Sequence, residues 1–194
     1  PLLDVCLAEP QGERFTRLAL ENTDARLAVG KPVSPAFLLA ALLWQEVKRC
    51  SEILETAGLP AQVALTQAMD QVLDLQAEQL AIPRRFGSQM KEIWLMQPRF
   101  LSRQGKRAYR LLESPRFRAG FDFLMLRCAS GELPLALGEW WETFQFAASS
   151  TREQMVRALQ ETSDPTPARK RRRRRRKPTV LGEEEEGKIG RAHV

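Results

Sequence analysis

The chain has 194 residues, of which 43% are hydrophobic and 28% charged, and its formal net charge is +6. This length suits one ordinary domain with a tail. No stretch approaches the ~18 consecutive apolar residues of a membrane span, and the first residues lack the pattern of a signal peptide. Three widely spaced cysteines, Cys6, Cys50 and Cys128, indicate a reducing compartment and neither a disulfide framework nor a zinc site. We therefore predict a cytoplasmic protein without a transmembrane segment.

Helical periodicity dominates the chain up to residue 147. Ser34 followed by Pro35 is typical of a helix start, because serine caps free N–H groups and proline at the first helical position loses no hydrogen bond. Gly58 marks the end of this helix. Apolar spacing predicts a second helix between residues 65 and 80, and a third over 90–101 that is interrupted or kinked at Pro98.

The remaining elements are also helical. Ser114 and Pro115 repeat the cap-plus-proline pattern, and they predict a helix over 115–129. This helix is apolar on nearly all sides, so we expect it to be the central buried helix. A last helix is predicted over 135–146, and no alternating strand pattern appears. The predicted fold class is all-α, an irregular multi-helix body with a disordered basic C-terminal tail.

Composition and charge divide the chain into three predicted parts. Residues 1–83 form a helical body, 84–147 an arginine-rich helical domain, and 148–194 a disordered tail with basic and acidic runs. The tail carries one weak helical patch around 154–159, and it becomes rich in Pro, Arg and Glu from Ser163 onward. Such a composition cannot bury enough apolar area to fold.

Enzyme signatures are absent from the sequence. The single histidine, His193, lies next to the C-terminus, and no glycine-rich phosphate-binding motif is present. Asp70 and Asp74 are four residues apart and could in principle share a metal ion, but a solvated helix face is the simpler interpretation. We therefore predict no catalytic residue and no metal site, and a chain that is inactive alone.

The most informative feature is the basic segment, residues 84–118, which holds 10 basic and 2 acidic side chains. Fixed cations at such density can follow the phosphates of a nucleic-acid strand, and arginine can bind phosphate bidentately. A solvated basic face is the alternative interpretation. The residues predicted to bind RNA are Arg84, Arg85, Arg99, Arg103, Lys106, Arg107, Arg110, Arg116, Arg118 and the aromatic Phe86.

The arrangement of these residues depends on the third helix. If it continues past Pro98, one helix face holds four cations, although Gly105 would break that register: Arg99, Arg103, Lys106 and Arg110. Arg84 and Arg85 are expected at the close of the second helix. Phe86 then falls in an interhelical loop and is the best candidate for stacking on a base.

Two other aromatic residues of the segment, Trp94 and Phe117, have the helical phase of core residues. We therefore expect both of them to be buried.

A second basic element lies in the tail. Nine consecutive cations favour polyanion binding without sequence preference, although a protein-docking segment, a membrane-surface patch or a nuclear signal would have the same composition. These residues are Arg169, Lys170, Arg171, Arg172, Arg173, Arg174, Arg175, Arg176 and Lys177.

Several ordered motifs of the chain resemble the C-terminal half of the bacterial poly(A) polymerases, within the tRNA nucleotidyltransferase/poly(A) polymerase family. The resemblance covers about residues 20–147, and the arginine-rich extension also fits. The motifs are Ala-Ile-Pro-Arg-Arg-Phe at 81–86, Glu-Ile-Trp at 92–94, Arg-Gln-Gly-Lys-Arg at 103–107, Arg-Leu-Leu-Glu-Ser-Pro-Arg-Phe-Arg-Ala at 110–119, and Trp-Trp at 140–141.

The resemblance implies a function in RNA metabolism. Members of that family add adenylates from ATP to RNA 3′ ends, which promotes decay, and their chemistry belongs to an N-terminal head with paired aspartates that hold two Mg²⁺ ions. The head is absent here, so the resemblance implies no cofactor in this chain and assigns ATP and Mg²⁺ to the missing part. It implies single-stranded RNA 3′ ends as partners, together with RNA-decay proteins or an RNA chaperone.

Two alternative functions remain open at this point. One is the body of a CCA-adding tRNA nucleotidyltransferase, and the other is a stand-alone RNA or protein interaction module.

Overall fold

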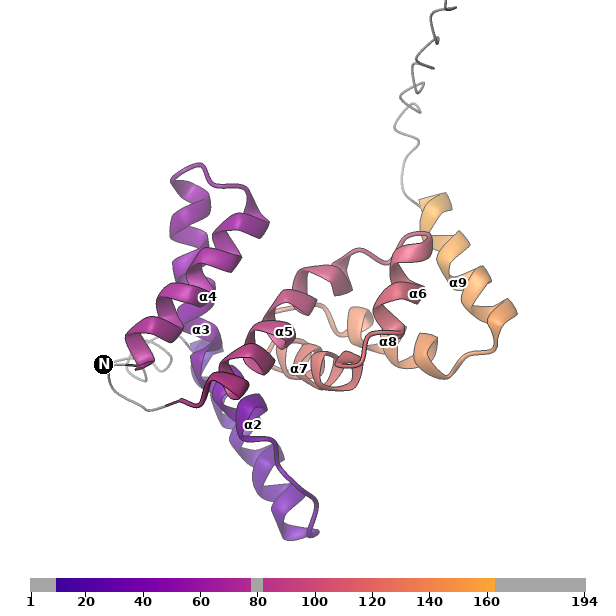
Figure 1. Cartoon of the computed structure of the whole chain (residues 1–194). Helices are drawn as coiled ribbons and strands as arrows, with labels where there is room; N and C mark the ends of the chain where they lie inside the picture. The colour runs from indigo at the N-terminus through magenta and orange to yellow at the C-terminus, as the bar shows by residue number, and fades with distance from the viewer. Residues whose placement is uncertain (1–9, 78–81, 163–194) are drawn as a thin grey trace, which may run out of the picture. The chain divides into compact units, whose positions relative to one another are not determined.

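The fold follows from helices whose ends are set by proline, serine and glycine. The computed structural model describes residues 10–77 and 82–162, and within these ranges it contains eight helices and no strand (Figure 1). The all-α prediction is therefore confirmed, and none of these helices is long and apolar enough to cross a membrane. The helices are α2 (Pro10–Ala28), α3 (Pro35–Thr56), α4 (Ala61–Ala77), α5 (Arg84–Leu101), α6 (Lys106–Leu112), α7 (Phe117–Ala129), α8 (Leu135–Phe146) and α9 (Ser149–Thr162).

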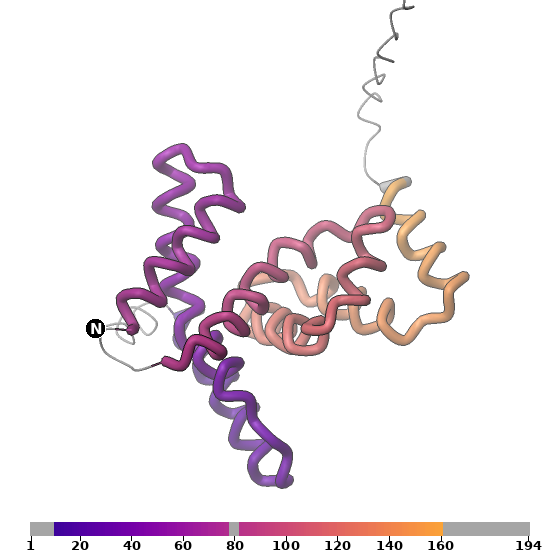
Figure 2. Tube along the Cα trace, in the orientation of Figure 1, coloured from indigo at the N-terminus to yellow at the C-terminus, as the bar shows by residue number. Residues whose placement is uncertain are grey.

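Helices α3 and α4 pack side by side as a hairpin, and α5 continues from the base of that hairpin toward α6 (Figure 2). The predicted start of α3 is confirmed, because the Ser34 hydroxyl accepts a hydrogen bond from the Phe37 N–H at 3.4 Å and Pro35 is the first helical residue. Gly58, with φ of +97°, follows the end of the helix. Such a backbone conformation favours glycine.

The helix break after α5 corrects two predictions about the basic segment. Helix α5 continues through Pro98, which lies inside its last turn, and ends at Leu101, so an interruption at Pro98 is wrong, while a kink there stays a prediction. Gly105, with φ of +56°, separates it from α6. Arg99 and Arg110 therefore lie on different helices, and the single continuous face is wrong.

Two apolar clusters form the core of the body. The first joins α2, α3, α4, α5 and α7, and the second joins the end of α5 to α6, α7, α8 and α9. Helix α7 contributes Phe123 to the first cluster and Leu124 to the second, and both side chains are fully buried. The prediction of a central buried helix is thus confirmed. Helices on both sides of residue 83 share the first cluster, and the division into three parts stays a prediction.

The ends of the C-terminal helices differ in detail from the sequence pattern. Helix α7 begins at Phe117, whose N–H donates to the Ser114 carbonyl at 2.9 Å, so Ser114 ends a turn and does not cap the helix. Helix α8 covers the predicted 135–146.

Helix α9 covers Ser149–Thr162, where the sequence indicates only a weak helical patch in the tail. The Arg152 guanidinium anchors it by donating to the carbonyls of Phe144 and Gln145, each at 2.8 Å. The rest of the predicted disordered tail, including the basic run 169–177, lies outside the described residues.

Candidate nucleic-acid interface

A cleft of about 930 Å³ lies between the α3–α4 hairpin and the ends of α5 and α6. Helix α3 contributes polar and charged side chains, among them Lys48 and Glu52, while Leu65 of α4 and Leu95 of α5 provide apolar surface. Three predicted RNA-binding residues line it: Arg99 from the last turn of α5, and Arg107 and Arg110 from α6. All three are exposed. The turn at Gly105, which breaks the single helix face, is thus what brings α6 back to the same cleft as Arg99.

Two other predicted RNA-binding residues, Arg103 in the turn before α6 and Lys106 at its start, do not line this cleft. Arg103 is half-buried, with its guanidinium 5.3 Å from the centre of the Trp140 ring, and burial lowers the pKa of Arg103 below its usual value. Lys106 is exposed at the first position of α6. Arg103 is therefore partly committed to packing on α8.

Arg116 and Arg118 line a different cavity of about 700 Å³, whose lining comes from the end of α2, the turn after it, the start of α3, and the residues at and just before the start of α7. Arg116 pairs with Glu92 at 2.8 Å and Arg118 with Asp122 at 3.1 Å, and the two arginine side chains are 46% and 70% exposed to solvent. Exposed pairs of this kind contribute little stability, so the two guanidinium groups remain accessible to another anion. The predicted basic segment is therefore divided between separate places on the body.

The predicted interhelical loop around Phe86 is also corrected. Arg84, Arg85 and Phe86 form the first turn of α5 instead of closing the preceding helix. Phe86 is half-buried against the first apolar cluster, and the Arg85 guanidinium lies 5.0 Å from its ring centre. Base stacking by Phe86 stays a prediction. The expected burial of Trp94 and Phe117 is confirmed.

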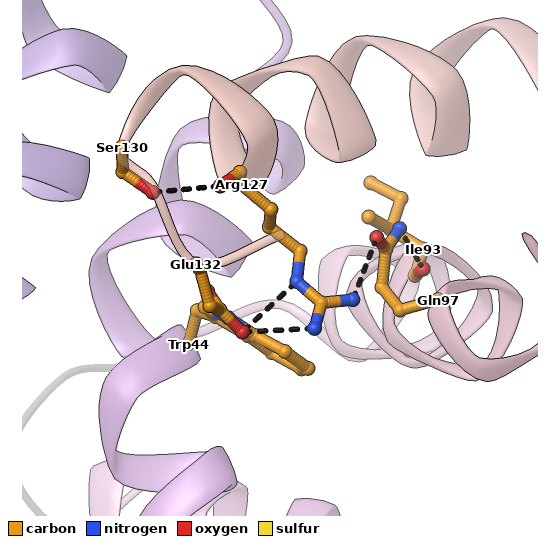
Figure 3. Close-up of polar contacts among 6 residues, drawn as sticks. All are labelled: Trp44, Ile93, Gln97, Arg127, Ser130 and Glu132. Atoms are coloured by element: carbon orange, nitrogen blue, oxygen red, sulfur yellow. Dashed lines mark hydrogen bonds and ion pairs between the residues drawn. The ribbon is translucent and has the colours of Figure 1, made fainter. Parts of the chain in front are cut away.

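The floor of the cleft holds a buried ion pair that sequence reasoning did not find. Arg127 donates from Nε and Nη2 to Glu132 Oε1 at 3.0 and 2.8 Å, and the two side chains are only 10% and 8% exposed (Figure 3). Trp44 Nε1 donates to Glu132 Oε2 at 3.0 Å, and Arg127 Nη1 donates to Gln97 Oε1 at 3.3 Å. Both buried charges are therefore compensated, and the pair ties α7 and its following loop to α3 and α5. The available signal was the position of Arg127 in the last turn of α7, directly after the apolar run Phe123–Leu126.

Groups suited to redox or metal chemistry are sparse in this part of the chain. Cys50 and Cys128 are free thiols, and burial raises the pKa of Cys128. Asp70 pairs with Lys91 of α5. Within residues 10–77 and 82–162, no three His, Cys, Asp or Glu side chains come together as a metal site would require.

Comparison with known proteins identifies the family. The family model described as "Polymerase A arginine-rich C-terminus" matches residues 57–178. Poly(A) polymerase I of Escherichia coli O6:H1 and that of Salmonella typhi are each 40% identical over 162 residues, which cover 81% of this chain and 34% of the relative. Poly(A) polymerase I of Haemophilus influenzae is 38% identical over 174 residues, covering 89% of this chain and 38% of the relative.

The chain thus spans little more than a third of the length of these curated relatives. The matched family and the resemblance seen in the sequence agree, and the matched region is the C-terminal part of the relatives. The chain therefore belongs to the polymerase A arginine-rich C-terminus family of bacterial poly(A) polymerase I.

Proposed function

We propose that this chain is the RNA-binding C-terminal part of a bacterial poly(A) polymerase. In this proposal a catalytic head outside the chain adds adenylates from ATP, with Mg²⁺, to RNA 3′ ends and so promotes decay. The chain itself holds the single-stranded RNA and carries no catalytic residue. Other proteins of RNA decay, or an RNA chaperone, are the additional partners proposed for it.

The observation that supports this proposal is the convergence of three exposed arginines on one cleft. Arg99, Arg107 and Arg110 line its basic side, and each guanidinium can bind a phosphate through two parallel hydrogen bonds. Leu65 and Leu95 give the cleft apolar surface. A nucleotide unit offers both kinds of surface, because its phosphate is anionic and its base has an apolar face.

The test compares two matched double variants of the full chain. Arg107→Ala/Arg110→Ala removes two exposed cations three residues apart on α6, and Arg14→Ala/Arg17→Ala does the same on α2, where neither arginine lines the cleft. We expect only the α6 variant to weaken binding of a labelled oligo(A) RNA clearly in an anisotropy titration. Its salt dependence should become shallower by about 1.4 in the log–log slope, since each single-strand phosphate contact contributes roughly 0.7. If the two variants weaken binding equally, the cleft does not bind the RNA.

The tail is expected to add affinity without sequence preference. Deleting residues 169–177 removes nine cations and should weaken binding by a similar factor for oligo(A), oligo(U) and oligo(C). Replacing the seven arginines of this run by lysine in the full chain should keep most of the affinity, because the contribution is one of charge. A loss confined to one RNA sequence, measured by the same titrations, would contradict the proposed role.

A further inference from the structure

A second basic cavity, of about 700 Å³, lies where the α2–α3 turn meets the start of α7. Four cations line it: Arg26 from the last turn of α2, Lys31 from the turn that follows, Arg116 from the residue before α7, and Arg118 from α7. Asp122 is the one carboxylate in the lining. Arg26 and Lys31 lie outside the basic segment defined by the sequence, so the fold assembles a cationic site that charge counting along the chain does not reveal.

The end of α2 and the turn that follows it place Arg26 and Lys31 at this cavity. Gly30, with φ of +67°, takes a left-handed conformation, and its N–H donates to the Leu27 carbonyl at 3.0 Å. The Lys31 N–H donates to the Arg26 carbonyl at 2.9 Å, which closes the helix end and reverses the chain. Arg26 Nη2 also donates to the Pro32 carbonyl at 3.2 Å. The position of both cations therefore follows from defined backbone geometry.

The charges of the cavity are not balanced. Asp122 pairs with Arg118, and burial raises the pKa of Asp122 while Arg118 and Arg26 lower it. Arg116 pairs with Glu92, which is not part of the lining. The Lys31 ammonium has no ion pair or side-chain hydrogen bond among the residues that the structure describes. With Glu92 counted beside Asp122, four cations face two carboxylates, and this excess of positive charge attracts an anion.

We infer that this cavity binds a nucleotide unit of the same single-stranded RNA, with its phosphate on Arg26, Lys31, Arg116 and Arg118. The inference rests on the proposed function and adds to it a second contact place, separate from the cleft lined by Arg107. The cavity is larger than a lone phosphate requires, and its wall includes Phe37 and Val33, which offer apolar surface to a ribose or base.

The test uses charge changes that leave the core untouched. Lys31→Glu reverses an exposed cation of the cavity, and Arg14→Glu reverses an exposed cation on α2 that lines neither cavity. With the full chain and a labelled oligo(A) RNA, we expect Lys31→Glu to weaken binding about tenfold more than Arg14→Glu. Its log–log salt slope should also fall by roughly 0.7, the value of one lost single-strand phosphate contact.

A variant that is expected to bind RNA more tightly distinguishes an effect on binding from a loss of folding. Asp122→Asn removes the carboxylate that competes for Arg118 and should tighten RNA binding, a result that a merely destabilised protein would not give. If Lys31→Glu matches Arg14→Glu and Asp122→Asn does not tighten binding, the cavity is no RNA site, while the proposed function stands. If the unchanged chain binds no RNA, the proposed function fails and this inference fails with it.

Discussion

Replacing Glu132 by alanine is expected to destabilise the body by about 3 to 5 kcal/mol, the usual cost of removing one partner of a buried ion pair. The substitution leaves Arg127 charged and only 10% exposed, and it removes the acceptor of the Trp44 indole N–H. Urea unfolding followed by circular dichroism at 222 nm measures the loss.

The matched control removes both charges of this pair together. Arg127→Met/Glu132→Leu replaces the ion pair by apolar side chains of similar size, which is often neutral or stabilising. We expect the double variant to be clearly more stable than Glu132→Ala alone. A Glu132→Ala protein as stable as the unchanged chain would show that the pair is not desolvated in solution.

The second large effect is expected at Trp141, whose neighbour Trp140 serves as the control. Trp141 is fully buried, donates from Nε1 to the Phe100 carbonyl at 2.9 Å, and meets the Phe100 ring edge to face at 5.1 Å. Trp141→Ala therefore creates a large cavity, and we expect it to cost about 3 to 5 kcal/mol.

Trp140 is half-buried and contacts Arg103 and Phe144. Trp140→Ala should cost much less, because water can fill the space that its side chain leaves. Both values come from the same urea titrations. A Trp140→Ala variant as unstable as Trp141→Ala would contradict the assigned burial.

Much of the helical architecture could be predicted because local sequence features, such as capping residues, glycine and apolar runs, determine where these helices begin and end. The Ser34–Pro35 cap and Gly58 place α3, and continuous apolar character places α7 and α8. Helix α2 escaped the sequence analysis because only Phe15 and Ala19 of its apolar residues are buried, so its apolar stripe is short. The sequence indicates only a weak helical patch at α9, because the helix is held in place by tertiary contacts of Arg152 with the end of α8.

The candidate site was predictable in composition but not in grouping. A charge count along the chain finds Arg107 and Arg118, yet it cannot tell that they line different cavities. That separation depends on the turn at Gly105 and on the packing of α7, which are tertiary features. Lys31 joins Arg118 only through the fold, across a long separation in sequence.

Helix α7 contributes side chains to both apolar clusters, and it therefore couples the stability of one cluster to that of the other. Because neighbouring residues Phe123 and Leu124 fill different clusters, neither cluster can melt without exposing part of the helix that completes the other. The α3 and α6 walls of the basic cleft accordingly belong to one cooperative unit. If an anion binds to Arg107 and Arg110 of α6, as proposed, its binding free energy stabilises the same folded unit that contains the α3–α4 hairpin, through linkage between binding and folding.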